Sequence, residues 1–477
     1  MRKVRNPADR DGTREKEMDQ SAMSQDTKGY GRMQNLLLIL AACIAIDQTL
    51  LSVLVLAALL HGLYLAWQER NGKRRIRTWP KGLKYLLLLL LADGYASLHN
   101  PLVTHEAVVT FNFFYVVGQY TAIVWLFTRF GNLFAGWPDP FAGGLSGPAE
   151  GQGDAGGAGR SFGDVFRSQP FPLRVLRVLG WVALVVLAGG VLQHFFGGAT
   201  DAIWVDRTAN PLLKTRIFST WENPNILAGY LCVVAAYVMS YISVVKESRR
   251  RWILCGILLV TLLCQVYTFS RGFWAAMAAE VLAFVLLFYR RGILFLLGAG
   301  AAGGALAGPA VWQRLATLKD ITADSSAAMR LAYIEIAGAI VRDHPLGIGW
   351  YNYRYVFPEY DYYFRNPDVI MYHCHNLFLN FAAELGLQGA VLFGAAWIFF
   401  LVLAWQLHRS GRFLWMKAMG RGYLLMSLGI FVGGLGDHVF FNVRMGALFW
   451  LLSTLLVLTR QYGLYVPGPA EAGKAEK

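Results

Sequence analysis

Residues 391–407 are VLFGAAWIFFLVLAWQL and residues 252–269 are WILCGILLVTLLCQVYTF, two uncharged and almost wholly apolar stretches. A helix needs roughly 20 such residues to cross the hydrocarbon core of a bilayer. Because lipid offers no partners to backbone groups, only helices and closed barrels cross it, and a barrel strand would alternate polar and apolar residues. These stretches do not alternate, so they predict membrane-spanning helices.

The composition of the whole chain agrees with this prediction. Of its 477 residues 56% are hydrophobic and 16% are charged, whereas a soluble protein carries about a quarter charged residues. The net charge of +14 comes from short basic runs between the apolar stretches, as in cytoplasmic loops. No nucleic-acid signature accompanies them, so we expect membrane lipid and no nucleic acid as a partner. The five cysteines have no spacing typical of disulfides or zinc.

We therefore expect an all-α polytopic membrane protein with about 12 transmembrane helices. The expected spans lie near residues 35–48, 50–67, 83–99, 107–130, 178–196, 222–245, 252–269, 272–289, 292–312, 385–407, 420–438 and 444–459. The first two admit an alternative, because 36–67 is either a tight pair broken at Asp47-Gln48 or one long tilted helix.

The basic clusters predict the orientation in the membrane. Those at 73–84, 246–251, 290–291 and 408–417 fall on one side when the spans are counted in order. Both chain ends fall there too, which predicts a multi-pass protein of the cytoplasmic membrane with cytoplasmic termini. The expected parts are a tail over 1–34, N-terminal transmembrane helices over 35–130, a Gly-rich cytoplasmic linker over 131–177, a second transmembrane domain over 178–460 with a large outer loop over 313–385, and a tail over 461–477.

The outer loop carries a helical pattern of its own. Ser325 and Ser326 can cap a helix that runs to Val341 and ends at 343–345. Its apolar face is predicted to hold Leu331, Ile334, Ala337 and Val341.

Four arginines are expected at the outer face, where the positive-inside rule predicts few. They are Arg216, Arg271, Arg330 and Arg444. A guanidinium offers a planar fork that suits phosphate oxygens, so the set indicates an anionic ligand such as a lipid phosphate or pyrophosphate. Taken singly, Arg216 and Arg444 fit better as anchors on lipid headgroups.

Two further features lie around the start of the tenth expected span. His375 is a candidate general base, because a neutral imidazole accepts a proton near neutral pH; a structural histidine is the alternative. With His373 and Cys374 it could also chelate a metal, but further ligands are lacking at a suitable spacing, and we expect no metal.

A polar stripe follows His375 on the same expected helix. Asn376, Asn380, Glu384 and Gln388 recur at four-residue intervals, which places them on one face. Such a stripe faces either a wet cavity or a neighbouring helix, and both interpretations remain open.

Several short motifs together resemble the O-antigen ligase and polysaccharide polymerase superfamily. They are the segments 343–349 (DHPLGIG), 375–379 (HNLFL) and 383–387 (AELGL), together with Asn223-Pro224-Asn225 and Ser270-Arg271-Gly272. The resemblance extends over roughly residues 216–460 and is best in the outer loop.

This resemblance implies a catalytic domain over 178–460 with a GT-C-like fold and no cofactor. The implied activity is metal-independent transfer of a glycan from an undecaprenyl-pyrophosphate carrier to an acceptor hydroxyl on a glycan, lipid or protein. By motif match, His375 is the catalytic histidine, and Arg216, Arg271 and Arg330 bind the diphosphate. Further candidate site residues are Asn223, Asn376, Glu384 and Arg444.

The motifs do not distinguish a ligase from a repeat-unit polymerase. A transporter of the lipid-linked glycan would favour charges along a path through the membrane, but only Asp93 and Glu280 are plainly expected at depth. A membrane scaffold would explain the spans but not the outer arginines.

Overall fold

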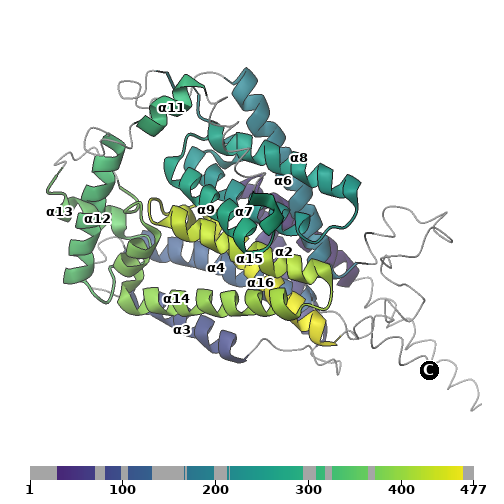
Figure 1. Ribbon diagram of the computed structural model, residues 1–477. Coiled ribbons are helices and arrows are strands. Elements are labelled where there is room, and N and C mark those ends of the chain that lie inside the picture. The colour runs from purple at the N-terminus through teal and green to yellow at the C-terminus, as the bar shows by residue number, and fades with distance from the viewer. Residues whose placement is uncertain are drawn as a thin grey trace, which may run out of the picture.

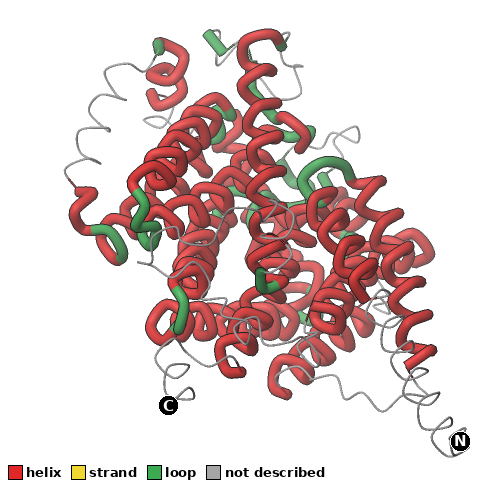
Figure 2. The backbone as a smooth tube through the Cα atoms, turned by 90° about the vertical axis from the view of Figure 1, so that its right-hand side faces the viewer, coloured by secondary structure: helices red, strands yellow, loops and turns green. Residues whose placement is uncertain are grey.

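A computed structural model describes residues 30–69, 81–97, 106–131, 166, 169–197, 212–213, 215–293, 308–316, 325–363 and 371–465. Over these residues the chain is helical and forms no strand (Figures 1 and 2). The predicted all-α class is therefore confirmed for the described part of the chain.

Seven of the described helices are long and apolar enough to cross a membrane. This supports a multi-pass membrane protein, although it does not establish the predicted number of twelve spans. The seven helices are α2 (Gln48–Glu69), α4 (Glu106–Gly131), α6 (Phe171–Phe196), α7 (Pro224–Ile242), α8 (Ser248–Tyr267), α14 (Leu377–Ser410) and α16 (Val443–Tyr465).

Three other predicted spans form helices that are shorter or more polar. They are α3 (Lys81–Ser97), α9 (Arg271–Leu287) and α15 (Leu414–Gly434). The predicted span at 292–312 lies largely outside the described residues, as do the linker and both tails.

The ambiguity at residues 36–67 is resolved in favour of two helices. One helix covers residues 30–43, a turn follows at 44–46, and α2 begins at Gln48. The Asp47 carboxylate accepts a hydrogen bond from the Leu50 N–H at 2.8 Å, which caps the first turn of α2.

The centre of the bundle is α15, which packs against α7, α9 and α14. Small residues make these approaches close, as is usual between membrane helices. Gly422 faces Tyr237 of α7, while Gly429 and Gly433 face Glu280 and Phe273 of α9, and a Cβ at any of the three would collide with those side chains.

Helix α14 is kinked at Gly386, where φ is 77° and ψ is 173°. The kink exposes carbonyl groups that the segment 345–349 uses: Ile348 N–H donates to Ala383 O at 2.9 Å and Gly349 N–H to Glu384 O at 3.0 Å. Gly347, with φ of 91°, crosses Gly386 backbone to backbone. Only glycine tolerates both the dihedral angles and the contact, so the crossing holds the outer loop on α14.

That loop contains α12 (Ser325–Asp343) and α13 (Tyr353–Tyr360), and α11 (Pro309–Ala316) extends across its start. Helices α12 and α13 lie together at the left of Figure 1, and α12 packs on α14. The predicted extent of α12 is right, but of its predicted apolar face only Ala337 is buried. Its buried residues are Tyr333, Ile336, Ala337 and Ile340, whereas Leu331 is exposed and Ile334 and Val341 are half-buried.

The rotation of this face has a physical cause in the loop itself. The buried side of α12 packs on the aromatic side chains of α13, chiefly Tyr353 and Phe357, and on Cys374. Two overlapping apolar stripes run along α12, and the α13 aromatics pack on one of them. The periodicity of the α12 sequence alone does not indicate which stripe is buried.

Candidate functional site

Loops from distant parts of the sequence meet at one end of the bundle, which we call the site end. Thr220 Oγ1 donates to Ala45 O at 2.6 Å, Ile217 N–H donates to Tyr267 O at 3.1 Å, and Asn376 Nδ2 donates to Leu435 O at 3.1 Å. The basic runs at the ends of α7, α14 and α15 gather at the opposite end, where Arg421 contacts both His408 and Ser243. The helix ends beside the basic runs at 246–251 and 408–417 therefore lie together.

A chain of side-chain hydrogen bonds joins His375 to Arg216. His375 Nδ1 lies 3.2 Å from Asp437 Oδ1, and Asn225 Nδ2 donates to Asp437 Oδ2 at 2.8 Å. Arg216 Nη2 in turn donates to Asn225 Oδ1 at 2.9 Å, and its Nε donates to Thr268 O at 2.8 Å. Two predicted site residues that are 159 positions apart in the sequence thus lie within one network.

Asp437 fixes the state of the imidazole. Its burial alone would raise the pKa of the carboxyl group, but the hydrogen bond with His375 and the nearby positive charge of Arg330 lower that pKa well below its usual value. An ionised carboxylate only accepts hydrogen bonds, so Nδ1 of His375 carries the proton. In the neutral ring this tautomer leaves the lone pair on Nε2, which is the arrangement that a general base requires.

Arg216 lies among other guanidinium groups. It is 7% exposed, and burial lowers its pKa to about 9, with further lowering by Arg314, Arg330 and Arg271. Arg271 opens α9 and Arg330 lies on α12, and both are near enough to Arg216 to lower its pKa. Such a cluster favours a multiply charged anion, which would offset the mutual repulsion.

Arg314 on α11 joins this cluster, and our sequence analysis missed it. It lies just inside the predicted outer loop. In the sequence Arg314 is a single basic residue among apolar neighbours in a short segment. This pattern does not indicate where the segment packs.

Two more histidines flank His375. The backbone N–H of His375 donates to His373 Nδ1 at 3.2 Å, and burial lowers the pKa of His373 well below its usual value. Burial likewise lowers the pKa of His438 to about 3. Both side chains are therefore neutral near neutral pH and do not add to the positive charge beside Asp437.

His373, His375 and Asp437 together form a group with metal-ligand geometry. Their donor atoms all lie within 4.8 Å of one another, and Asp437 supplies the third ligand that was lacking at the sequence level. His373 Nδ1 and His375 Nδ1 both take part in hydrogen bonds. Treatment with a chelator distinguishes a metal ion from proton transfer at this group.

Backbone strain is concentrated at the same loops. The described non-glycine residues with positive φ are Ser219, Glu222, Phe269, Tyr351 and His375. They lie close in sequence to Arg216 or Arg271, or in the outer loop. Strain of this kind costs about 1–3 kcal/mol per residue and is typical of functional sites.

The other candidate residues hold the frame of the site. Asn223 caps α7 and Asn376 caps α14, each accepting two backbone N–H groups. Arg444 is only 2% exposed, donates to Ile46 O at 3.0 Å and lies 4.8 Å from the ring centroid of Trp221.

The polar stripe on α14 divides at the kink. Glu384 Oε1 accepts the Tyr353 N–H at 3.4 Å, and Asn380 accepts the Cys374 N–H at 3.2 Å. Gln388 lies beyond Gly386 and donates to Leu346 O at 3.0 Å. The stripe therefore fastens the outer loop to α14.

Asp437 is the main residue that sequence analysis missed. We placed it inside a predicted span at 420–438, but α15 ends at Gly434 and Asp437 lies in the loop that follows. The available signal was the run Gly433-Gly434-Leu435-Gly436 before Asp437-His438, since glycine commonly marks the end of a helix.

Comparison with known proteins gives one family match. No curated protein matches the chain. Residues 256–394 match the family model for O-antigen ligase (Wzy_C), a segment that includes Arg271, Arg330 and His375 but ends before Asp437. The family suggests a glycosyltransferase-like ligase or polymerase function in polysaccharide biosynthesis. The match supports the membership of this chain in the O-antigen ligase superfamily.

Proposed function

We propose that the protein transfers a glycan from an undecaprenyl-pyrophosphate carrier to an acceptor hydroxyl at the outer face of the cytoplasmic membrane. The site end then faces outward, and both termini lie in the cytoplasm. The observation that carries the proposal is the hydrogen-bonded chain from His375 through Asp437 and Asn225 to Arg216. This chain of hydrogen bonds supports a site in which a base and a cation cluster act together.

In this mechanism, Nε2 of His375 removes the proton from the acceptor hydroxyl. The oxygen attacks the anomeric carbon, and the bond between that carbon and the pyrophosphate oxygen breaks. The electron pair leaves with the lipid pyrophosphate, whose growing charge is stabilised by Arg216, Arg271 and Arg330. Attack opposite the leaving group inverts the anomeric carbon. Asp437 stabilises the imidazolium that forms.

The remaining candidates are proposed to position these groups. Asn223 and Asn376 fix the first turns of α7 and α14, and Arg444 fixes the turn at Ile46. Glu384 holds the loop that covers the site. None of the four is proposed to contact the pyrophosphate.

The central test is His375→Ala in a purified assay with a synthetic lipid-linked oligosaccharide and candidate acceptors. We expect transfer to fall at least 1,000-fold, because general-base catalysis and the orientation of the hydroxyl are both lost. Carrier binding should persist. The control His61→Ala removes a histidine from α2 and should leave transfer unchanged. Full transfer by His375→Ala would overturn the assignment.

The same assay tests the proposed metal independence. Treatment with a chelator should leave the rate unchanged, since the arginines supply the positive charge. Loss of transfer that zinc restores would assign His373, His375 and Asp437 to a metal instead.

The acceptor decides between the two members of the superfamily. Transfer of a finished glycan to a non-carrier lipid or to protein defines a ligase, which is our first proposal. Extension of one carrier-linked repeat unit by another would define the alternative, a polymerase.

A further inference from the structure

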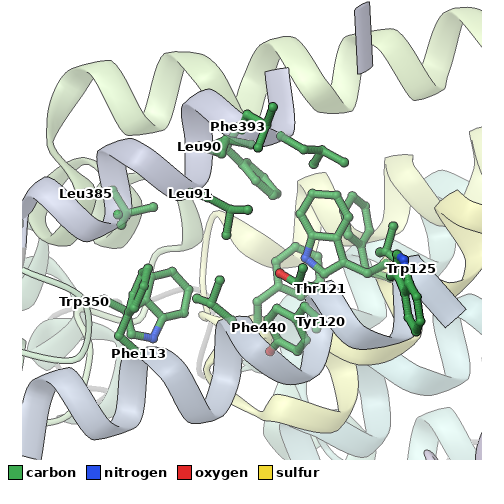
Figure 3. Close-up of a pocket in the computed structure, with 18 of the residues that line it drawn as sticks. Leu90, Leu91, Phe113, Tyr120, Thr121, Trp125, Trp350, Leu385, Phe393 and Phe440 are labelled. Carbon is green, nitrogen blue, oxygen red and sulfur yellow. The ribbon is translucent and has the colours of Figure 1, made fainter. Parts of the chain in front are cut away.

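A large apolar cavity lies apart from the catalytic group, between α3 and α4. Its volume is about 540 Å³, within the range of roughly 300–1,000 Å³ that is usual for ligand sites. Figure 3 shows Trp350, Phe113 and Leu385 at one end and Tyr120, Thr121 and Trp125 towards the other.

The cavity exists because two consecutive helices pack on different partners. Helix α3 packs on α14 and α4 packs on α16, while α3 and α4 hardly contact each other. Leu90 and Leu91 of α3 and Phe393 of α14 form one wall. The gap opens between helices that are expected to cross the membrane, so lipid has access to it.

The two ends of the cavity differ in charge. Lys84 near the start of α3 and Arg129 near the end of α4 line one end, which is the end of the bundle opposite the site end. The positive-inside rule assigns that end to the cytoplasm. The other end is lined by Trp350, Phe381 and Phe440, none of which carries a charge.

The length of the cavity suits a lipid chain. From Arg129 to Phe113 it follows α4 for about 24 Å at the helical rise of 1.5 Å per residue. One leaflet of the hydrocarbon core is roughly 15 Å deep. A chain that enters at Arg129 would therefore pass the middle of the membrane and end beneath Trp350.

We propose that this cavity binds an anionic phospholipid of the cytoplasmic leaflet, with its headgroup at Lys84 and Arg129 and one hydrocarbon chain in the cavity.

The charge pattern favours this occupant over the tail of a carrier whose headgroup is at the site end. Such a headgroup would lie at the uncharged end of the cavity, near Phe381 and His438, whose rings are 5.5 Å apart. The arginine cluster instead approaches Asp437 through Asn225. A pyrophosphate at the Trp350 end would thus lie on an apolar lining, while an anionic headgroup at the other end meets two cations.

The lipid would also connect the membrane with the site. Trp350 stacks on Phe381 with centroids 6.1 Å apart, and Phe381 contacts His438, the neighbour of Asp437. A filled cavity would support Trp350 from below and so steady the outer loop.

The test measures lipid binding to the purified full-length protein by native mass spectrometry. The probes are phosphatidylglycerol, phosphatidylcholine with the same chains, and a polyprenyl phosphate. We expect phosphatidylglycerol to bind best. Lys84→Gln and Arg129→Gln should weaken it about fivefold each and about thirtyfold together, from the usual contribution of a basic residue near the membrane surface. The binding of phosphatidylcholine should change little.

Matched variants distinguish lipid binding in the cavity from lipid binding elsewhere on the protein. Thr121→Trp fills the cavity and should weaken every lipid probe, whereas Leu60→Trp on the exposed side of α2 should not. Arg249→Gln removes a basic residue at α8, away from the cavity, and should leave binding unchanged. Equal phosphatidylglycerol binding by the wild type and the double variant would overturn the proposal. If polyprenyl phosphate bound more tightly than phosphatidylglycerol, and equally to the wild type and the double variant, the cavity would be assigned to the carrier instead. Neither result depends on transfer activity.

Discussion

Two buried carboxylates at the site end, Asp437 and Glu384, make different kinds of contact. Asp437 is 6% exposed and Glu384 is 4% exposed. Asp437 bonds the side chains of His375 and Asn225, which lead to the arginine cluster. Glu384 bonds the backbone N–H of Tyr353. Similar burial therefore serves two purposes: one carboxylate sets the state of a base, and the other holds a loop.

The largest expected effect comes from Asp437→Asn, which keeps the shape of the side chain but removes its charge. The imidazole of His375 loses the partner that selects its tautomer and stabilises its protonated form. We expect the turnover rate to fall about 10³- to 10⁴-fold, equivalent to about 4–5.5 kcal/mol in the barrier. The measurement is initial transfer rate at saturating carrier.

Two further measurements on Asp437→Asn distinguish a loss of catalysis from a loss of folding. Thermal unfolding and carrier binding should remain close to those of the wild type. A variant that keeps more than a tenth of the wild-type rate would show that Asp437 does not act through His375.

The next largest effect is expected at the crossing of Gly347 and Gly386, which holds the outer loop on α14. Gly386→Ala places a Cβ in a backbone conformation that favours glycine, about 2.5 Å from the carbonyl carbon of Leu346. We expect a loss of about 3 kcal/mol in the free energy of unfolding, from backbone strain and overpacking together.

The same helix provides the control for this substitution. Gly394→Ala adds a methyl group where no atom lies within 4 Å, and it should be neutral or slightly stabilising. Denaturant unfolding of both purified variants makes the comparison. Equal stability of Gly386→Ala and Gly394→Ala would mean that the crossing at Gly347 does not hold the loop.

The helices were predictable because membrane crossing leaves a local signal. A long apolar run predicts a helix wherever it occurs: α8 follows the run at 252–269 closely, whereas α14 contains the run at 385–407 but begins earlier, at Leu377. The exact start of α14 was harder to predict from the sequence. Its polar first turn from Leu377 belongs to the loop by composition and becomes helical because Asn376 caps it.

The site was predictable only where a residue type was unusual for its place. Arg216, Arg271 and His375 stood out because charge and imidazole are rare at the outer edge of a span. Asp437 and Asn225 did not stand out, since each acts through a contact between loops that are far apart in the sequence. Such contacts depend on packing of α7 against α15, which no local pattern encodes.

An effect of intermediate size is expected in the pH dependence of the free energy of unfolding, through His438 beside Asp437. His438 has its pKa lowered by burial to about 3, against about 6.5 when unfolded. The unfolded chain therefore binds more protons between these values, and stability falls as the pH falls below about 6.5. From pH 7 to pH 5 the loss is about 2 kcal/mol. Asp437, whose pKa is lowered, adds nothing in this window because it is ionised in both states.

Thermal unfolding in detergent at the two pH values provides the measurement. His438→Gln should reduce the acid-induced loss by about that amount. His373 shifts in the same direction, so a residual loss should remain. An unchanged loss in His438→Gln would place the sensitivity elsewhere.

The smallest effect is expected from Glu384→Gln, the counterpart of the Asp437 substitution. Glutamine keeps the shape of the side chain and an oxygen that accepts the Tyr353 N–H. Because this carboxylate holds backbone and does not adjust an imidazole, we expect about 1 kcal/mol of lost stability and less than a threefold change in rate. Glu384→Ala, which removes the acceptor, should lose more stability than Glu384→Gln. If Glu384→Gln were instead as inactive as Asp437→Asn, the loop carboxylate would itself belong to the chemistry, and the division between the two acids would fail.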